Sequence, residues 1–361
     1  MKTTPKRDAQ KDILKILDSL GIESKANEAM HSTQAGYGDE FVPEDLAQTV
    51  IEKARDKSVF LNRIPAENIW DPMPTQPYDI PVEGADPTFY GSDESTDDNA
   101  TTDAVSSSKA GTNKLQLDAK KYTAITYLSG ELDEDARIAG GMQNYVTAKL
   151  GKAFAELIDK VWVNGDTTNA ATGNVNLDDA DPADSAYYLK QSGLVRAALD
   201  LSSDNSVGTM DTADFKAARK ELGILGADPA ELMWCFNLES YYELLTIAQL
   251  ETLEKRGPAA TIIDGTVASI QGIPVTYLSS FQKAEADGKM STTGSNNTLG
   301  RFLLVHLPSL YFGWRRKLKI VIDYLPHKDK YRICAHSRFA VKVNTNNSQV
   351  PVALGRNITL S

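Results

Sequence analysis

The sequence predicts an α+β protein, built from one long helix, a unit of alternating helices and strands, and a β-rich C-terminal part. Three observations carry this prediction. Apolar residues recur at helical spacing from Met142 to Trp162. Helix-like and strand-like segments alternate between residues 186 and 300, and residues 302–354 are rich in β-branched and aromatic side chains. A chain of 361 residues has room for two or three domains at about 150 residues each.

The charge and the cysteines narrow the class of protein. The 38 basic and 49 acidic residues give a net charge of −11. A protein whose main task is to bind nucleic acid needs a basic surface that displaces counterions from the phosphates. The acidic balance of this chain argues against that class of protein. Cys235 and Cys334, the only cysteines, stand in apolar runs and are expected to be buried thiols. No run approaches the roughly 18 to 20 apolar residues of a membrane helix, so we expect no membrane contact.

Two amphipathic helices are expected near the N-terminus. Residues 8–20 place apolar side chains at helical spacing before Gly21. This helix packs on the body of the protein or is left mobile, or it serves as a peripheral helix for assembly or scaffold binding. A less favoured alternative is adsorption to a membrane, because its charges nearly cancel. Pro43 opens a second helix that reaches about residue 54. Residues 58–65 are then expected to be extended.

A long two-stranded arm is predicted from residue 71 to residue 128. Prolines recur through residues 72–87 and exclude a helix there. Residues 86–118 carry seven carboxylates against two lysines, a net charge of −5, and few apolar side chains. Residues 114–128 (KLQLDAKKYTAITYL) have the composition of one strand. Because an isolated hairpin is marginally stable in water, this arm needs another surface to lie on.

The long helix is expected to end at Asn164 and Gly165. After it, further helices are predicted at 187–199, 212–222 and 238–256, and strands at 231–236 and 274–279. Residues 314–343 carry nine basic residues against two acids, a net charge of +7. The molecule is therefore acidic in one arm and basic in its last strands.

Catalytic motifs are missing from the sequence. It has no Gly-rich phosphate loop, no nucleophile elbow and no zinc-ligand spacing. His306 and His336 stand in apolar strand contexts and are expected to be structural. The run from Trp314 to Lys317 could stack on nucleic acid, or it could form a charged edge strand or a salt-bridging protein interface. We expect no catalytic residue, cofactor or metal.

Three passages carry a resemblance to a known family. Residues 114–136 (KLQLDAKKYTAITYLSGELDEDA) are similar to the passage from an extended loop into a capped helix. Residues 150–166 are similar to the end of a long spine helix, and residues 269–275 (SIQGIPV) to a Gly-x-Pro-Val strand. In this order and spacing, they resemble the major capsid protein of tailed bacteriophages, whose fold is shared with encapsulin shells.

The resemblance implies a division of the chain. It comprises an N-terminal amphipathic or peripheral segment (1–30), an N-terminal arm (31–70), an extended loop (71–122), a peripheral domain (123–185 and 315–361) and an axial domain (186–314). It also implies a structural protein that self-assembles, as pentamers and hexamers, into the icosahedral shell around a double-stranded DNA genome. The expected location is the virion, after assembly in the host bacterial cytoplasm. Further expected partners are portal, scaffold and decoration proteins, with packaged DNA as a non-specific neighbour.

A candidate interface follows from the charges and the resemblance together. In the family, the extended loop lies across the peripheral domain of a neighbouring subunit. The acidic side chains of the loop would then face the basic strands of the neighbour. The residues are Asp93, Glu94, Asp97 and Asp98 on the loop, and Arg315, Arg316, Lys317 and Lys319 on the strands. Two alternatives remain: an encapsulin-like nanocompartment shell, and a soluble α/β enzyme with a polar pocket near His306 or His336.

Overall fold

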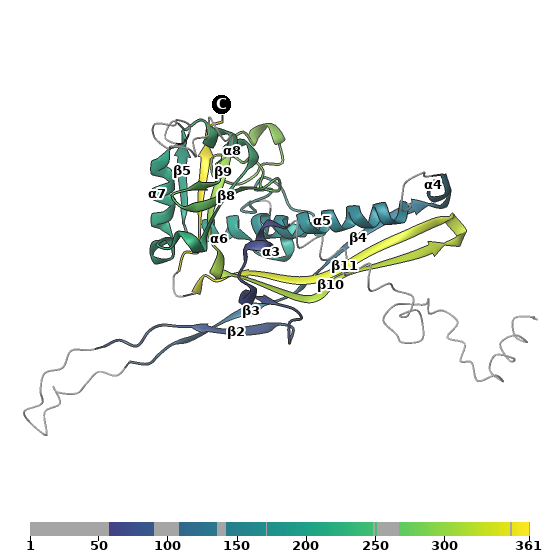
Figure 1. The fold of residues 1–361 in the computed structure, drawn as a ribbon, viewed down its shortest axis with the longest axis horizontal. Helices are drawn as coiled ribbons and strands as arrows, with labels where there is room; N and C mark the ends of the chain where they lie inside the picture. The colour runs from purple at the N-terminus through teal and green to yellow at the C-terminus, as the bar shows by residue number, and fades with distance from the viewer. Residues whose placement is uncertain are drawn as a thin grey trace, which may run out of the picture. The chain divides into compact units, whose positions relative to one another are not determined.

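A computed structural model describes residues 58–89, 108–135, 142–170, 172–247, 250, 267–346 and 349–360. The chain divides into two compact units, Met1–Asp45 and Leu46–Ser361, and all described residues belong to the second. The helices expected at 8–20 and 43–54 lie outside the described residues, as does the acidic segment from Asp93 to Asp98. Figure 1 shows the described elements of the second unit.

The long predicted helix is confirmed as α5, Met142–Asn164. Its apolar face buries Phe154, Ile158, Val161 and Trp162 in the larger of the hydrophobic cores. The helix stops where the backbone N–H of Gly165 donates to the carbonyl of Val161 at 3.1 Å. A side chain at 165 would collide with backbone atoms of Gln191 and Gly193, so the close packing at this end requires glycine.

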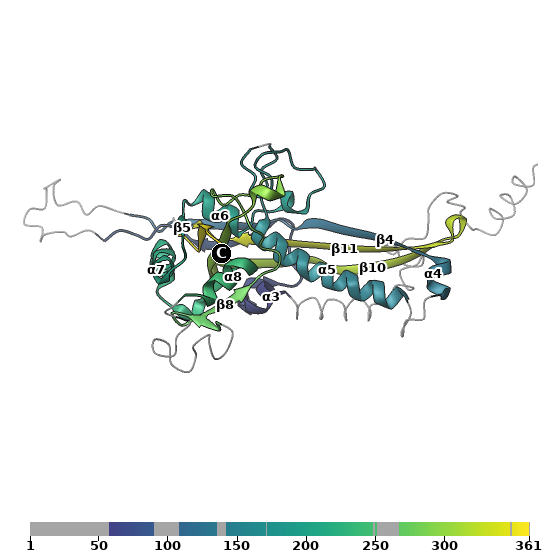
Figure 2. The ribbon, with the colours of Figure 1, turned by 90° about the horizontal axis from the view of Figure 1, so that it is seen from above.

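A four-stranded sheet runs beside α5 (Figures 1 and 2). Its strands, in spatial order, are β1 (Ile69–Trp70), β10 (Leu310–Leu325), β11 (Lys330–Val343) and β4 (Lys120–Ser129). β10 and β11 form a long antiparallel hairpin, which turns through η10 (Pro326–Lys328) and Asp329, at φ 42°. β4 pairs with β11 and is an edge strand of this sheet.

The second sheet of the fold has six strands. In spatial order its strands are β5 (Asp204–Gly208), β12 (Val352–Ile358), β9 (Gly300–His306), β6 (Leu232–Phe236), β8 (Ile273–Tyr277) and β7 (Ser269–Ile270). Alternate residues of β6 enter two cores: Met233 joins the core of α5, whereas Trp234 packs under α7 (Thr212–Glu221) and α8 (Leu238–Leu245). This sheet therefore separates two hydrophobic layers.

A third sheet is the two-stranded hairpin of β2 (Tyr78–Glu83) and β3 (Thr112–Leu117). Its buried residues Ile80 and Leu117 share a small core with Met73 and with Ala340 of β11. The base of the hairpin is thereby fixed on the four-stranded sheet. Figures 1 and 2 both show the hairpin leading away from α5.

Short helices complete the described part of the chain. The α-helices are α3 (Val59–Arg63), α4 (Gly130–Asp135) and α6 (Leu194–Asp200). The 3-10 turns are η2 (Ala66–Asn68), η4 (Tyr187–Lys190), η5 (Gly223–Gly226), η6 (Pro229–Glu231), η8 (Gly294–Asn296) and η9 (Leu307–Ser309). No helix of the described residues is long and apolar enough to cross a membrane.

The single strand predicted over 114–128 is wrong, because the chain changes sheets at Asp118 and Ala119. The Gln76 side-chain amide donates to the Asp118 carboxylate at 2.6 Å and to the Ala119 carbonyl at 3.0 Å. These two bonds hold the corner between β3 and β4. A composition typical of strands cannot reveal such a corner, since both halves remain strands.

Two further local predictions also need correction. Residues 58–65 contain α3 rather than an extended segment. The helix expected at 187–199 is split into η4 and α6, because Gln191 is extended and its side-chain amide donates to Tyr122 Oη and to the Phe339 carbonyl, each at 3.0 Å. Strand β5 was not predicted. Helix α8 ends at Leu245, and most of the rest of 238–256 lies outside the described residues.

Candidate interaction surface

The four-stranded sheet has one face packed on α5 and one outer face. Along β11, Ile333, Ala335 and Phe339 enter the core beneath α5. Because side chains alternate across a strand, His336 and Arg338 project from the opposite, outer face. Among the described residues, Met73 and Leu117 cover the outer face near the base of the hairpin, where they pack against Ala340.

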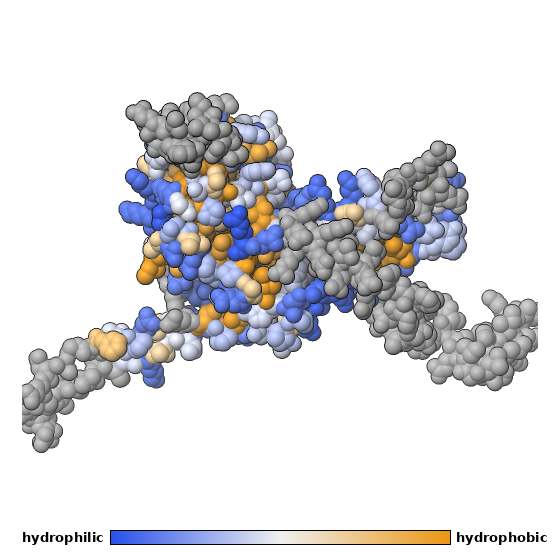
Figure 3. Space-filling view, in the orientation of Figure 1, coloured by the Kyte–Doolittle hydropathy of each residue, from blue (hydrophilic) through white to orange (hydrophobic). Residues whose placement is uncertain are grey.

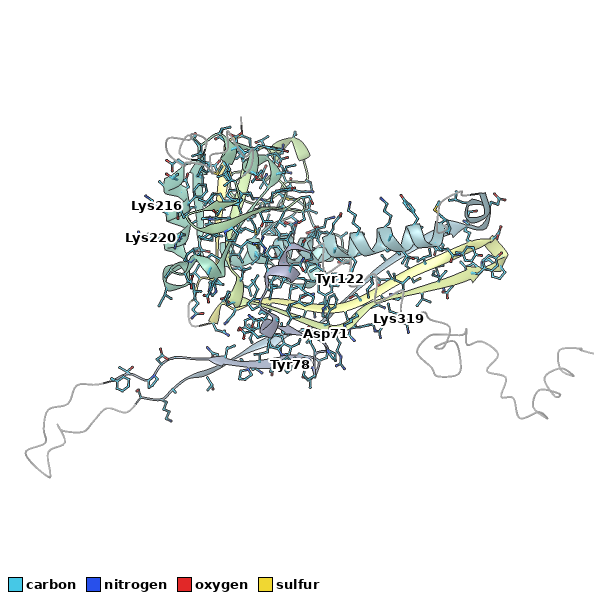
Figure 4. All side chains as sticks on the ribbon, viewed as in Figure 1. Asp71, Tyr78, Tyr122, Lys216, Lys220 and Lys319 are labelled. Atoms are coloured by element: carbon cyan, nitrogen blue, oxygen red, sulfur yellow. The ribbon has the colours of Figure 1, made fainter. Side chains whose placement is uncertain are left out.

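Basic side chains form a row across three strands of this outer face. In the strand register Arg338 of β11 lies opposite Lys121 of β4 and Arg316 of β10. The next row contains Lys319 opposite His336. We name Lys121, Arg316 and Arg338 the basic row; Lys319, which projects from β10 in Figure 4, lies beside it. Cations on neighbouring strands repel one another, so their gathering favours contact with an anionic partner.

The pKa of His336 reflects the positive charge of this surface. Burial lowers its pKa below the ordinary value of 6.5, and the nearby cations Lys121 and Arg316 lower it further. The imidazole is therefore neutral at physiological pH. Its Nδ1 lies 3.2 Å from the hydroxyl of Thr123 on β4.

A shallow hollow of about 450 Å³ lies at the hairpin end of the basic row. Its lining contains four basic side chains and one carboxylate: Gln76, Asp118, Ala119, Lys120, Lys121, Arg316 and Arg338. The carboxylate of Asp118 is already paired with Lys120. Three cations, Lys121, Arg316 and Arg338, thus have no carboxylate within 4 Å among the described residues.

The structure separates the four basic residues predicted for the interface. Arg315 donates to the carbonyl of Met73 at 2.9 Å, and Lys317 pairs with Asp71 at 2.8 Å. Both therefore hold the 71–73 segment of the same chain. Arg316 lines the hollow, and Lys319 lies in the adjacent row. The predicted acidic partners Asp93, Glu94, Asp97 and Asp98 lie outside the described residues.

Sequence reasoning missed Lys121 as a member of this surface. The alternation of Lys121, Thr123, Ile125 and Tyr127 along β4 places them on one side of the strand, and this signal could have identified it. The suggested stacking of Trp314 on nucleic acid is wrong, because Trp314 is buried against Phe154, Phe312 and Phe339. β1 pairs with β10 only at Phe312 and Gly313, so among the described residues no strand pairs with Arg315–Lys317 on that side.

Beyond the basic row, the outer face exposes two large apolar side chains next to an ion pair. Ile125 and Tyr127 are 54% and 60% exposed. They lie opposite Cys334 and Arg332 in the register of β11. Arg332 forms an ion pair with Asp323 at 2.7 Å. An apolar strip beside a basic row is the composition of a protein-binding surface rather than of a solvated sheet face.

A second hollow, of about 300 Å³, lies at the β4 edge between the sheet and α5. We call it the edge pocket. Its lining is mainly apolar: Lys121, Tyr122, Thr123, Ala124, Leu150, Ala153, Phe154, Leu157, Ser185, Tyr187, Lys190, Leu318, Ala335 and Ser337. Tyr122, labelled in Figure 4, stacks on Phe339 with ring centroids 4.5 Å apart.

These features together define a structural shell subunit: a spine helix backed by a four-stranded sheet, a projecting hairpin and a separate six-stranded sheet. The chain belongs to the Phage capsid family, whose sequence profile matches residues 38–220. The predicted resemblance is confirmed. The protein is a structural component of a phage capsid, and the nanocompartment and enzyme alternatives are not favoured.

Solved phage structures share the fold. A structure from Mycobacterium phage Bobi is 15% identical, with a TM-score of 0.57 over 84% of this chain and 91% of that one. One from Microbacterium phage Oxtober96 is 16% identical, with a TM-score of 0.59 over 84% and 90%. The mature capsid of bacteriophage PhiM1 is 12% identical, with a TM-score of 0.50 over 84% and 87%. Comparison with curated proteins gave no match.

Proposed function

We propose that this protein is the major shell subunit of a tailed phage, and that its copies assemble as pentamers and hexamers into an icosahedral shell around double-stranded DNA. Assembly takes place in the host bacterial cytoplasm. Portal, scaffold and decoration proteins are the further partners, packaged DNA is a non-specific neighbour, and neither membrane binding nor catalysis is part of the role. Membership of the capsid family and the projecting hairpin support this proposal.

We assign the parts of the chain to the roles that the family resemblance implies. Residues 1–30 form a peripheral segment, 31–70 an N-terminal arm and 71–122 the extended loop. Residues 123–185 and 315–361 form the peripheral domain around α5, and 186–314 the axial domain. Within 315–361, β12 (Val352–Ile358) departs from this division, because it pairs with β5 and β9 of the proposed axial domain.

One observation carries the proposed contact between copies: the basic row crosses three strands without carboxylate partners for Lys121, Arg316 and Arg338 among the described residues. The same chain carries a segment of net charge −5 over residues 86–118. Opposite potentials on two parts of one chain favour pairing between copies and set their register. We propose that Asp93, Glu94, Asp97 and Asp98 of one copy lie over the basic row of the next.

Charge reversal tests this contact. Replacing the four loop carboxylates (D93K, E94K, D97K, D98K) should impair shell formation or make it strongly salt-sensitive, as followed by negative-stain electron microscopy and sedimentation. The complementary variant K121E/R316E/R338E should fail in the same way. Combining the two sets of substitutions should restore shells, because the charges are then exchanged rather than lost.

The combined variant is also the control for misfolding, since it contains every single change. Normal shells from the loop variant, with an unchanged response to salt, would contradict the proposed contact. Wild-type protein that forms only small discrete oligomers, with and without scaffold and at every salt concentration, would contradict the shell role itself.

A further inference from the structure

Phe89 is the most exposed large apolar residue among the described residues, at 96%. It is the last described residue of the chain segment that follows β2. In Figure 3, orange-tinted apolar atoms lie on the projecting hairpin next to the grey atoms. The hairpin stays paired up to this point: the Ser108 hydroxyl accepts from the Thr88 N–H at 2.8 Å and donates to the Thr88 carbonyl at 3.0 Å. A phenyl ring held in water on a paired, extended support favours a contact that buries it.

The edge pocket has the size and chemistry to receive such a ring. Leu150, Phe154 and Leu157 of α5 form its apolar wall, and Leu318 and Ala335 contribute from the sheet. Its volume of about 300 Å³ exceeds the roughly 150 Å³ of a cavity that accommodates benzene. Lys121 and Lys190 supply the cationic groups of its lining.

Phe89 does not fill the pocket of its own copy. The base of the hairpin, where Gln76 contacts Ala119, adjoins Lys121 of the pocket. From Tyr78 to Thr88 the hairpin then runs away from that base for roughly 33 Å, at the 3.3 Å rise per residue of a strand. Figures 1 and 2 show this direction. The ring and the pocket therefore meet only between different copies.

We propose that Phe89 of one copy seats in the edge pocket between α5 and β4 of a neighbouring copy. Asp86 lies three residues before Phe89 and is exposed. In an extended chain the Cα atoms of the two residues are about 10 Å apart, so Asp86 adds negative charge to the segment that would approach the lysines at the pocket. The Phe89 segment is acidic and the pocket is lined by two lysines, and both are parts of this chain. This charge complementarity favours a second copy as the occupant of the pocket.

Phe89 and the edge pocket lie on different parts of the same chain, so the contact is heterologous and can be repeated from copy to copy around a ring. The inference rests on the proposed function, because it needs copies that assemble. It adds a specific anchor to the charge pairing proposed above. The anchor uses an apolar seat on the α5 side of β4 and shares Lys121 with the basic row of the outer face.

Photo-crosslinking tests the seat directly. p-Benzoylphenylalanine replaces Phe89 in the full chain, which is assembled with ¹⁵N-labelled wild-type subunits and irradiated. The expected cross-links join position 89 to labelled peptides from residues 149–157 or 121–124. The matched control places the same residue at Ile224, which is 86% exposed on η5 and should not cross-link to these peptides. Shells that form normally but cross-link position 89 only to other peptides would overturn the seat.

Substitutions give a second readout. F89A, which removes the ring, and A153F, which fills the pocket from an exposed position of α5, should each raise the subunit concentration needed for assembly at least tenfold. F89L should retain most of the assembly and I224A should leave it unchanged. If F89A and A153F assemble like wild type while the charge-reversal variants still fail, the seat is wrong and the proposed function stands. If wild type forms no shell, the proposed function itself fails.

Discussion

Asp159 of α5 accepts a hydrogen bond from the hydroxyl of Ser58 at 2.7 Å, although 101 positions separate the two residues. The same carboxylate also accepts from the backbone N–H groups of Val59 and Phe60, at 3.1 and 3.4 Å. These N–H groups open helix α3 and have no partner within the helix. A side chain from the long helix thus caps a helix far away in sequence and ties residues 58–60 to the core.

We predict that Ser58→Ala destabilises the protein by about 1–3 kcal/mol, because it leaves a buried carboxylate with one donor fewer. Asp159→Ala should cost more, since three donors lose their acceptor. Thermal unfolding of the purified full chain measures both. Thr75→Ala is a suitable control, because it removes a hydroxyl whose only hydrogen bond in the described residues is an exposed one, to the carbonyl of Pro77. Equal unfolding temperatures for S58A and wild type would contradict the cap.

The same carboxylate should make stability depend on pH. Burial raises the pKa of Asp159 above its ordinary 3.8, against the opposing effect of its three hydrogen bonds. Between 3.8 and the raised value the folded state binds the additional proton, so the free energy of unfolding falls as the pH rises through this window. Asp159→Asn cannot ionise and should show a smaller fall. Calorimetry between about pH 4 and pH 8 measures the free energy of unfolding of wild type and of Asp159→Asn. Identical slopes of this free energy against pH would contradict the prediction.

Arg301 is a fully buried cation in strand β9. Its guanidinium donates to the carbonyls of Gln282 and Gly288, at 2.6–3.1 Å. The guanidinium carbon lies 4.7 Å from the centre of the Phe281 ring. Burial lowers its pKa to about 9, so it remains charged at neutral pH. Arg301→Lys keeps the charge but loses the planar fork, and should destabilise the protein by about 3 kcal/mol.

The control for this prediction is the same substitution at Arg332, whose ion pair with Asp323 is exposed on both sides. Arg332→Lys should leave thermal unfolding nearly unchanged. If both variants unfold at the same temperature, Arg301 does not hold the 282–288 loop in the way we infer.

Gly355 of β12 lies directly opposite Phe302 of β9. A methyl group at this position would overlap the Phe302 ring, which is fully buried. Gly355→Ala should therefore overpack the core around Phe302 and cost about 1–3 kcal/mol. Gly294, with open space around it, is the control, and Gly294→Ala should unfold like wild type. Equal stability of the two variants would contradict the predicted collision.

Much of the fold was predictable because it depends on local patterns. The apolar repeat of α5, the buried run of β6 and the β-rich stretch of β9 to β12 were read correctly from periodicity and composition. Burial of Cys235 and Cys334 followed from their apolar neighbours and is confirmed. Each of these features depends only on the pattern of apolar residues along one helix or strand.

The sequence by itself determined the helical and strand periods, the charge segregation and the family to which the chain belongs. Only the tertiary structure decided which cations share a surface: Arg316 joins Lys121 and Arg338, while Arg315 and Lys317 turn to Met73 and Asp71. It also decided that Asp159 caps α3. The reason is that strand register and long-range hydrogen bonds join residues tens to hundreds of positions apart, and no local pattern encodes those pairings.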